Sequence, residues 1–98
     1  VNVLSDKQSD LCWKFAKSGT EATRFDGVAW HAAPSGAPVL DRAVAWIDCE
    51  VEEVYEMGDH YFVLGRVTAL DADADHDGLP PQPLVFYRGT IGGFAAEG

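Results

Sequence analysis

Two strand-like runs joined by a two-residue turn constrain this chain more than any other feature. The stretch from Trp46 to Val67 reads WIDCEVEEVYEMGDHYFVLGRV, and the segments on both sides of Gly58-Asp59 are rich in apolar and β-branched residues. Glycine accepts a positive φ without steric cost, and aspartate can hydrogen-bond its own backbone, so this pair is typical of a tight turn. The sequence therefore predicts a β-hairpin with His60 as the first residue after the turn.

The elements around this turn are predicted to be mainly strands. Residues 43–55 alternate in polarity until Glu52-Glu53, where a β-bulge explains the slip in the pattern. Asp48, Glu50 and Glu52 are expected on one face of this strand, opposite the apolar face that consists of Ala43, Ala45, Ile47, Cys49 and Val51. The partner, residues 60–70, carries apolar side chains on both faces, which predicts an interior strand. Gly65 within it permits a close backbone approach or a bend. A last short strand is expected over residues 83–88, and the fold class is therefore mainly β.

One N-terminal helix and a long loop precede the hairpin. A helix is predicted from Lys7 to Lys17, since Ser5 and Gln8 have the spacing of a capping box. Its apolar face consists of Leu11, Cys12, Phe15 and Ala16. Residues 20–42 are rich in turn formers and form a long loop, which is expected to be functional or packed over the core. The apolar anchors of that loop are Phe25, Val28 and Trp30.

Size and charge exclude several classes of protein. The chain has 98 residues, enough for a single small domain, and 47% hydrophobic residues allow a packed core. Its formal net charge of -9 disfavours nucleic acid and anionic membrane surfaces as partners. No apolar run approaches the roughly 18 residues needed to span a bilayer. Cys12 and Cys49 are expected to be buried thiols in a reducing compartment, which indicates a cytoplasmic protein.

A partial calcium pattern occurs at Asp73–Gly78, where carboxylates recur at the spacing of a calcium loop. The second half of the pattern fails because Leu84 stands where a bidentate glutamate is required. A solvated acidic loop between two strands is the favoured interpretation, and no metal site is predicted. His31 is interpreted as a surface or hydrogen-bonded histidine, and His76 as a solvent-exposed residue of the acidic loop.

The turn at Gly58-Asp59-His60 leaves two interpretations open. The glycine and aspartate specify a turn by themselves, so an ordinary hairpin accounts for them. The histidine is the additional element, because its flat ring can stack on a ligand or donate a hydrogen bond to its edge.

An ordered set of short motifs resembles the flavin reductase-like family, the small reductase components of two-component flavin monooxygenases. The set covers nearly the whole chain, and its members are Val1-Asn2-Val3-Leu4-Ser5, Phe15-Ala16, Arg24-Phe25-Asp26-Gly27-Val28, Ala45-Trp46-Ile47-Asp48-Cys49, Gly58-Asp59-His60, Gly65-Arg66-Val67 and Pro83-Leu84-Val85-Phe86-Tyr87-Arg88-Gly89. Each motif is weak alone, and their common order is the specific signal.

The resemblance implies a split β-barrel that binds FMN or FAD and works as a homodimer. NADH or NADPH would pass hydride to flavin N5, and the reduced flavin would diffuse to a separate flavin-dependent oxygenase. The protein groups of such an enzyme hold and orient the cofactor. By resemblance, His60 is the catalytic residue at the nicotinamide end, Gly58 and Asp59 shape the turn, and Tyr87 and Arg88 are further cofactor-binding residues. A surface arginine that pairs with an acid is the alternative for Arg88.

The family's N-terminal part, which carries most of the flavin site, has no counterpart in the chain. Residues 1–98 are therefore expected to be a single flavin reductase-like domain that lacks its N-terminal part, a partial split barrel that binds flavin poorly alone. The unpaired strand edges of a partial barrel predict a dimer. The alternative to a reductase is a non-catalytic flavin-binding or structural split-barrel protein.

Overall fold

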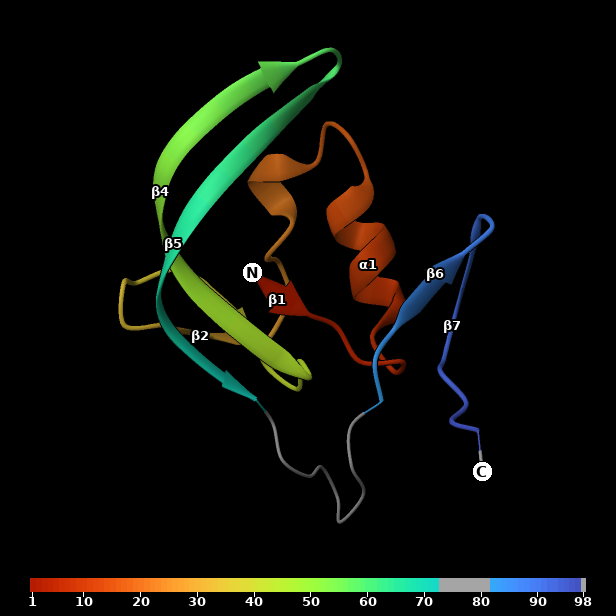
Figure 1. Cartoon of the computed structure of the whole chain (residues 1–98). Coiled ribbons are helices and arrows are strands. Elements are labelled where there is room, and N and C mark those ends of the chain that lie inside the picture. Colours follow the sequence, from red (N-terminus) through yellow and green to blue (C-terminus); the bar gives the residue numbers. More distant parts are fainter. Residues whose placement is uncertain (73–81, 98) are drawn as a thin grey trace.

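The computed structural model describes residues 1–72 and 82–97, which form a mainly β protein with one α-helix (Figure 1). In chain order the elements are β1 (Asn2–Val3), α1 (Ser9–Ala16), a 3-10 turn η1 (Glu21–Thr23), β2 (Trp30–Ala32), β3 (Pro38–Leu40), β4 (Ala45–Met57), β5 (His60–Ala72), β6 (Val85–Tyr87) and β7 (Thr90–Gly92). The described strands form a three-stranded sheet in the order β1-β4-β5 and two separate hairpins, β2-β3 and β6-β7. The predicted fold class is confirmed, and no closed barrel is formed by these residues.

The two longest strands, β4 and β5, form the predicted hairpin. Met57 pairs with His60 across the turn, and Gly58 has a φ of 65°. Asp59 is not among the residues with positive φ, so the turn has the pattern of type II′, in which glycine takes the first central position. Figure 1 shows both strands curving together along their length.

The predicted bulge at Glu52-Glu53 is confirmed. Val51 pairs with Gly65 and Glu53 pairs with Leu64, so Glu52 is the extra residue of β4. An extra residue on one strand bends that strand and increases its twist.

A second bulge, on β5, was not predicted. Asp48 pairs with Ala69 and Cys49 pairs with Val67, which leaves Thr68 as an extra residue on β5. The hydroxyl of Thr68 donates a hydrogen bond to the Asp48 carbonyl at 3.1 Å. Alternating polarity does not reveal such a bulge, because threonine is acceptable on either face of a strand.

The prediction that β5 is an interior strand is wrong for the residues that the structure describes. β5 pairs with β4 alone there and is an edge strand. Its apolar side chains are exposed, with Tyr61 at 70% and Leu70 at 65%. The sequence shows that both faces are apolar, but it does not show whether the same chain covers them.

Helix α1 is shorter than its predicted range of residues 7–17. The Ser5 amide donates to Gln8 Oε1 at 2.9 Å, as a capping box requires, while the Ser5 hydroxyl accepts from the Lys7 amide at 3.3 Å. These bonds close the turn before the helix, and the helix begins at Ser9 with no side-chain cap. The side-chain amide of Gln8 instead donates to the Asp41 carbonyl at 2.8 Å and ties this turn to the end of β3.

The predicted loop over residues 20–42 contains η1 and the hairpin β2-β3. Its aromatic anchors are confirmed, because Phe25 packs edge-on against Phe15 of α1 and against Trp30 of β2. The distances between ring centres are 5.1 Å and 5.8 Å, respectively. These contacts join the helix, the loop and the hairpin. The two strands escaped prediction because three residues are too few to show an alternating pattern.

Aliphatic side chains make up the core that the described residues bury. The buried hydrophobic residues are Ala33, Val39, Leu40 and Ala43. Asp48 was predicted on a polar, outward face of its strand, and that placement is wrong because its residue is only 4% exposed. Val51 was predicted on the inward face and is 67% exposed. The hairpin β2-β3 covers the beginning of β4, while the far half of β4 projects away from the body.

The final hairpin, β6-β7, replaces the single strand predicted over residues 83–88. It is joined to the N-terminal segment by an amide bond from Leu84 to the Leu4 carbonyl at 2.9 Å and by a bridge between Ser5 and Pro83. Figure 1 shows this hairpin standing beside α1, apart from the tip of β4-β5.

Candidate functional site

His60 lies at the exposed tip of the β4-β5 hairpin. Its side chain is 83% exposed, and its Nδ1 lies 2.6 Å from Asp59 Oδ1. A carboxylate at this distance accepts the Nδ1 proton, which leaves Nε2 of the neutral ring as an acceptor. The imidazole points outward from the end of the hairpin. Gly58, Asp59 and His60 therefore form one local unit in which the turn places the ring and the carboxylate orients it.

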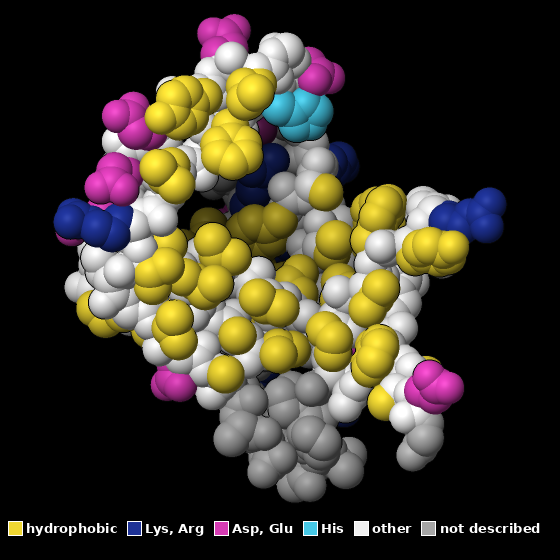
Figure 2. Space-filling view, viewed as in Figure 1, with side chains coloured by type: hydrophobic (Ala, Val, Ile, Leu, Met, Phe, Trp, Pro, Cys, Tyr) yellow, Lys and Arg dark blue, Asp and Glu magenta, His cyan; other side chains and the backbone are white. Residues whose placement is uncertain are grey.

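An apolar strip continues from His60 along the same face of the hairpin. Facing residues in an antiparallel pair share one side of the sheet, and alternate residues of each strand return to that side. The register therefore places Tyr55, Met57, Phe62 and Leu64 on the face that carries His60. All four side chains are exposed. Figure 2 shows hydrophobic side chains gathered beside a histidine at this end of the molecule.

This hairpin strip, defined as Tyr55, Met57, Phe62 and Leu64, can pack against a flat, uncharged ring. Two carboxylates lie beside it, since Glu53 is opposite Leu64 on the same face and Asp59 lies in the turn. Arg66 is paired with Glu50 at 2.6 Å, farther from the tip. The tip therefore disfavours a phosphate group and favours a ring that carries positive charge.

The structure keeps Tyr87 and Arg88 together but separates them from His60. The Arg88 guanidinium carbon lies 6.0 Å from the centre of the Tyr87 ring, within the range of a cation–π contact. Arg88 has a φ of 52°, which is uncommon for a residue other than glycine. Because β6-β7 stands apart from the tip of β4-β5 in Figure 1, the predicted cofactor-binding residues fall into two groups.

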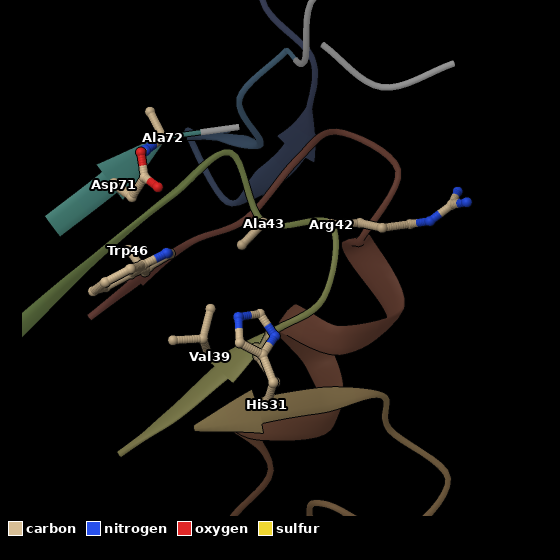
Figure 3. A pocket seen from close by; sticks show the side chains of 8 residues that line it. His31, Val39, Arg42, Ala43, Trp46, Asp71 and Ala72 are labelled. Atoms are coloured by element: carbon tan, nitrogen blue, oxygen red, sulfur yellow. The ribbon is translucent and has the colours of Figure 1, made fainter. Parts of the chain in front are cut away.

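One cavity was not predicted from the sequence. It has a volume of about 240 Å³ and contains His31, Trp46 and Asp71 in its wall (Figure 3). Its residues come from four strands and from the segment between β3 and β4, so their proximity depends on pairing between distant segments. No short motif of the sequence encodes such a site.

The partial calcium pattern at Asp73–Gly78 lies outside the described residues. Within residues 1–72 and 82–97, no three His, Cys, Asp or Glu side chains are grouped so that they could hold a metal ion. In the same ranges, no helix combines the length and the apolar character that crossing a membrane requires.

The curved sheet with its projecting hairpin places the chain in the class of split-barrel flavin proteins. Its structure superposes with a TM-score of 0.83 on nitrilotriacetate monooxygenase component B from Mycobacterium thermoresistibile, at 34% identity, over 96% of this chain and 50% of that chain. It superposes with a TM-score of 0.81 on a Streptomyces globisporus NADH:FAD oxidoreductase in complex with NAD and FAD fragments, at 29% identity, over 96% of this chain and 53% of that one.

Sequence comparison gives the family. The model of the flavin reductase like domain matches residues 1–95, and the chain belongs to this family. A flavin reductase from Pseudomonas putida is 42% identical over 96 residues, which cover 98% of this chain and 52% of the relative. The predicted resemblance is thereby confirmed. The chain spans about half the length of the relatives it matches.

Proposed function

We propose that this chain is part of an NAD(P)H:flavin oxidoreductase, in which NADH or NADPH reduces FMN or FAD. The observation that carries the proposal is the exposed His60 at the end of the apolar hairpin strip. Support comes from the family and from relatives named as a flavin reductase and an NADH:FAD oxidoreductase.

The residues of the tip fit a nicotinamide ring. The hairpin strip offers an apolar surface for a flat ring, and His60 offers a hydrogen-bonding edge beside it. Oxidised nicotinamide carries a positive charge, which the carboxylates of Asp59 and Glu53 favour. Asp59 holds the imidazole in one orientation, so His60 positions the ring without a reorganisation step. A bound flavin supplies the chemistry of hydride acceptance.

Tyr87 and Arg88 serve a different part of the cofactor in this proposal. The Arg88 guanidinium is the group in this pair that suits a phosphate, and the exposed Tyr87 ring suits an aromatic base. Their place apart from His60 suits a dinucleotide, whose ring and phosphate ends need distinct contacts.

Three further properties complete the proposal. The reduced flavin leaves for a separate flavin-dependent oxygenase, which is supported by the relative named as a monooxygenase component. The chain pairs with a second copy as a homodimer, which is supported by the exposed apolar side chains of β5. The protein works in the cytoplasm, which is supported by the free thiols of Cys12 and Cys49.

Turnover with a matched histidine control tests the reductase. We expect His60→Ala to lower NADH or NADPH oxidation with added FMN or FAD by about ten-fold or more, because the nicotinamide loses its positioning group. His31→Ala is the control, since His31 is also exposed and its Nδ1 also lies beside an aspartate, Asp41, at 2.9 Å. Equal rates for both variants, or turnover unaffected by His60→Ala, would contradict the role of His60.

A binding measurement tests the same site without flavin. We expect NADH to shift the ring NMR signals of His60 at millimolar concentration and to leave those of His31 unchanged. No shift at His60 would overturn the proposed nicotinamide contact. Flavin binding without this shift and without turnover would instead support the non-catalytic flavin-binding alternative.

A further inference from the structure

The cavity of about 240 Å³ is built where two separate sheets meet, and it lies outside the proposed nicotinamide site. One wall comes from the hairpin β2-β3. The other wall comes from the beginning of β4 and the end of β5. Ala43 lies in the segment that joins them (Figure 3). The cavity therefore exists only when the two sheets are docked against each other.

Two pairs of residues that face each other across neighbouring strands supply side chains to the cavity. Trp46 of β4 is directly opposite Asp71 of β5, so the indole and the carboxylate lie on the same side of the sheet. His31 of β2 is directly opposite Val39 of β3 in the same manner. Figure 3 shows these side chains turned toward a common space, with the imidazole directed into it.

Two polar groups of this space, His31 and Asp71, offer acceptors, and the Trp46 indole N–H is a donor. Asp41 Oδ1 lies 2.9 Å from His31 Nδ1, which leaves Nε2 of the neutral imidazole to accept a hydrogen bond. Asp71 Oδ1 accepts the Ala72 amide at 2.8 Å, and a carboxylate retains further acceptor capacity. Arg42 belongs to the wall, but its side chain points away from the cavity in Figure 3.

We propose that this cavity binds a small organic cation, a primary ammonium group on an apolar body. The ammonium has three donors for the Asp71 carboxylate and His31 Nε2. The face of Trp46 attracts the cation and packs against the apolar body, and Val39 and Ala43 contribute apolar walls. An anion of the same shape is opposed by Asp41, by Asp71 and by the net charge of -9. The inference does not rest on the proposed reductase function.

Three probes of one shape and different charge test the proposal. Benzylamine, benzyl alcohol and benzoate are titrated into the full chain, and the NMR signals of the Trp46 indole N–H and the His31 ring are followed. We expect benzylamine to bind at least ten-fold more tightly than benzyl alcohol and benzoate to bind most weakly. Equal affinities for the three probes would overturn the proposal.

Variants assign the binding to this cavity. Asp71→Asn keeps the shape of an exposed side chain and is expected to weaken benzylamine binding at least five-fold, because the carboxylate charge is lost. Asp10→Asn, on the exposed side of α1, is the control and should leave the affinity unchanged. An unchanged affinity in Asp71→Asn, or signal changes confined to residues outside the cavity, would also overturn the proposal.

Discussion

At the scale of single residues, Asp48 shows how a buried carboxylate joins two elements. The Ser35 hydroxyl donates to Asp48 Oδ1 at 2.6 Å, and the Ser35 amide donates to Oδ2 at 2.9 Å. These two bonds hold the pKa of Asp48 below its ordinary value, and the bond from the Ser35 hydroxyl has the larger effect. Burial of the carboxylate acts in the opposite direction and raises the pKa. The ionised side chain therefore fastens the turn of β2-β3 to β4.

The lowered pKa of Asp48 predicts an acid-sensitive fold. Because the folded pKa lies below the unfolded one, the stabilising contribution is present above the unfolded pKa and is lost as pH falls through the folded pKa. We expect the melting temperature to decrease between about pH 5 and pH 2, and Asp48→Asn to have a lower melting temperature at neutral pH and a flatter acid profile. Asp10→Asn is the control, and thermal unfolding followed by circular dichroism is the measurement. Matching acid profiles for Asp48→Asn and the original chain would contradict this assignment.

Residue identities predicted the turn but not the buried carboxylate. Glycine followed by aspartate between two apolar runs specifies a tight turn locally, so the position of His60 followed from neighbouring residues. Asp48 was placed outward because it alternates with apolar neighbours. Its burial depends on Ser35, which is thirteen residues away in the sequence, and alternation within one strand carries no information on such a partner.

At the scale of elements, Gly65 allows β4 and β5 to pack closely beside the first bulge. A Cβ atom at this position would lie 3.0 Å from Cys49 Cβ and 3.4 Å from Cys49 Sγ. The sequence prediction that Gly65 permits a close approach is confirmed, and the neighbour it accommodates is the side chain of Cys49.

We expect Gly65→Ala to destabilise the chain by about 1–3 kcal/mol, the usual cost of overpacking a close contact. Gly92→Ala is the matched control, because Gly92 is also in a strand and a Cβ there would meet no atom within 4 Å. Urea unfolding of both variants gives the two free energies. A difference of only a few tenths of a kcal/mol between them would show that Cys49 moves aside without cost.

The long elements were predictable, whereas β2, β3 and β7 were not. Alternation over more than ten residues placed β4 and β5 to within two residues of their observed ends. β1, β2, β3 and β7 have two or three residues each and are defined by their hydrogen-bonding partners. The cavity next to His31 and Trp46 was missed for the same reason, because its walls depend on how these short strands dock.

At the scale of the whole molecule, the described residues leave much apolar surface uncovered. The sequence predicted a packed core from its 47% hydrophobic content. Large hydrophobic side chains lie instead on the surface of β4 and β5, and the buried apolar residues of the described part are Ala33, Val39, Leu40 and Ala43. Composition reports how much apolar surface a chain has, but it does not report whether the chain itself or another molecule covers it.

The uncovered surface predicts that a charge on β5 weakens assembly. Val63 lies on the side of the hairpin opposite His60, together with Val54 and Tyr61, and all three are exposed. We expect light scattering to show a dimer at micromolar concentration, and Val63→Lys to raise its dissociation constant at least ten-fold. Asp10→Lys is the control for the added charge. A monomeric peak for the original chain would contradict the proposed homodimer.

The two bulges of the β4-β5 hairpin have a protective consequence. Fibril growth requires flat, straight strands that can stack indefinitely through their backbone groups. The extra residues at Glu52 and Thr68 bend and twist the hairpin. The edge of β5 is therefore poorly shaped for pairing with a strand of a further chain. The hairpin can thus expose an apolar surface for binding while its bent edge disfavours fibril growth.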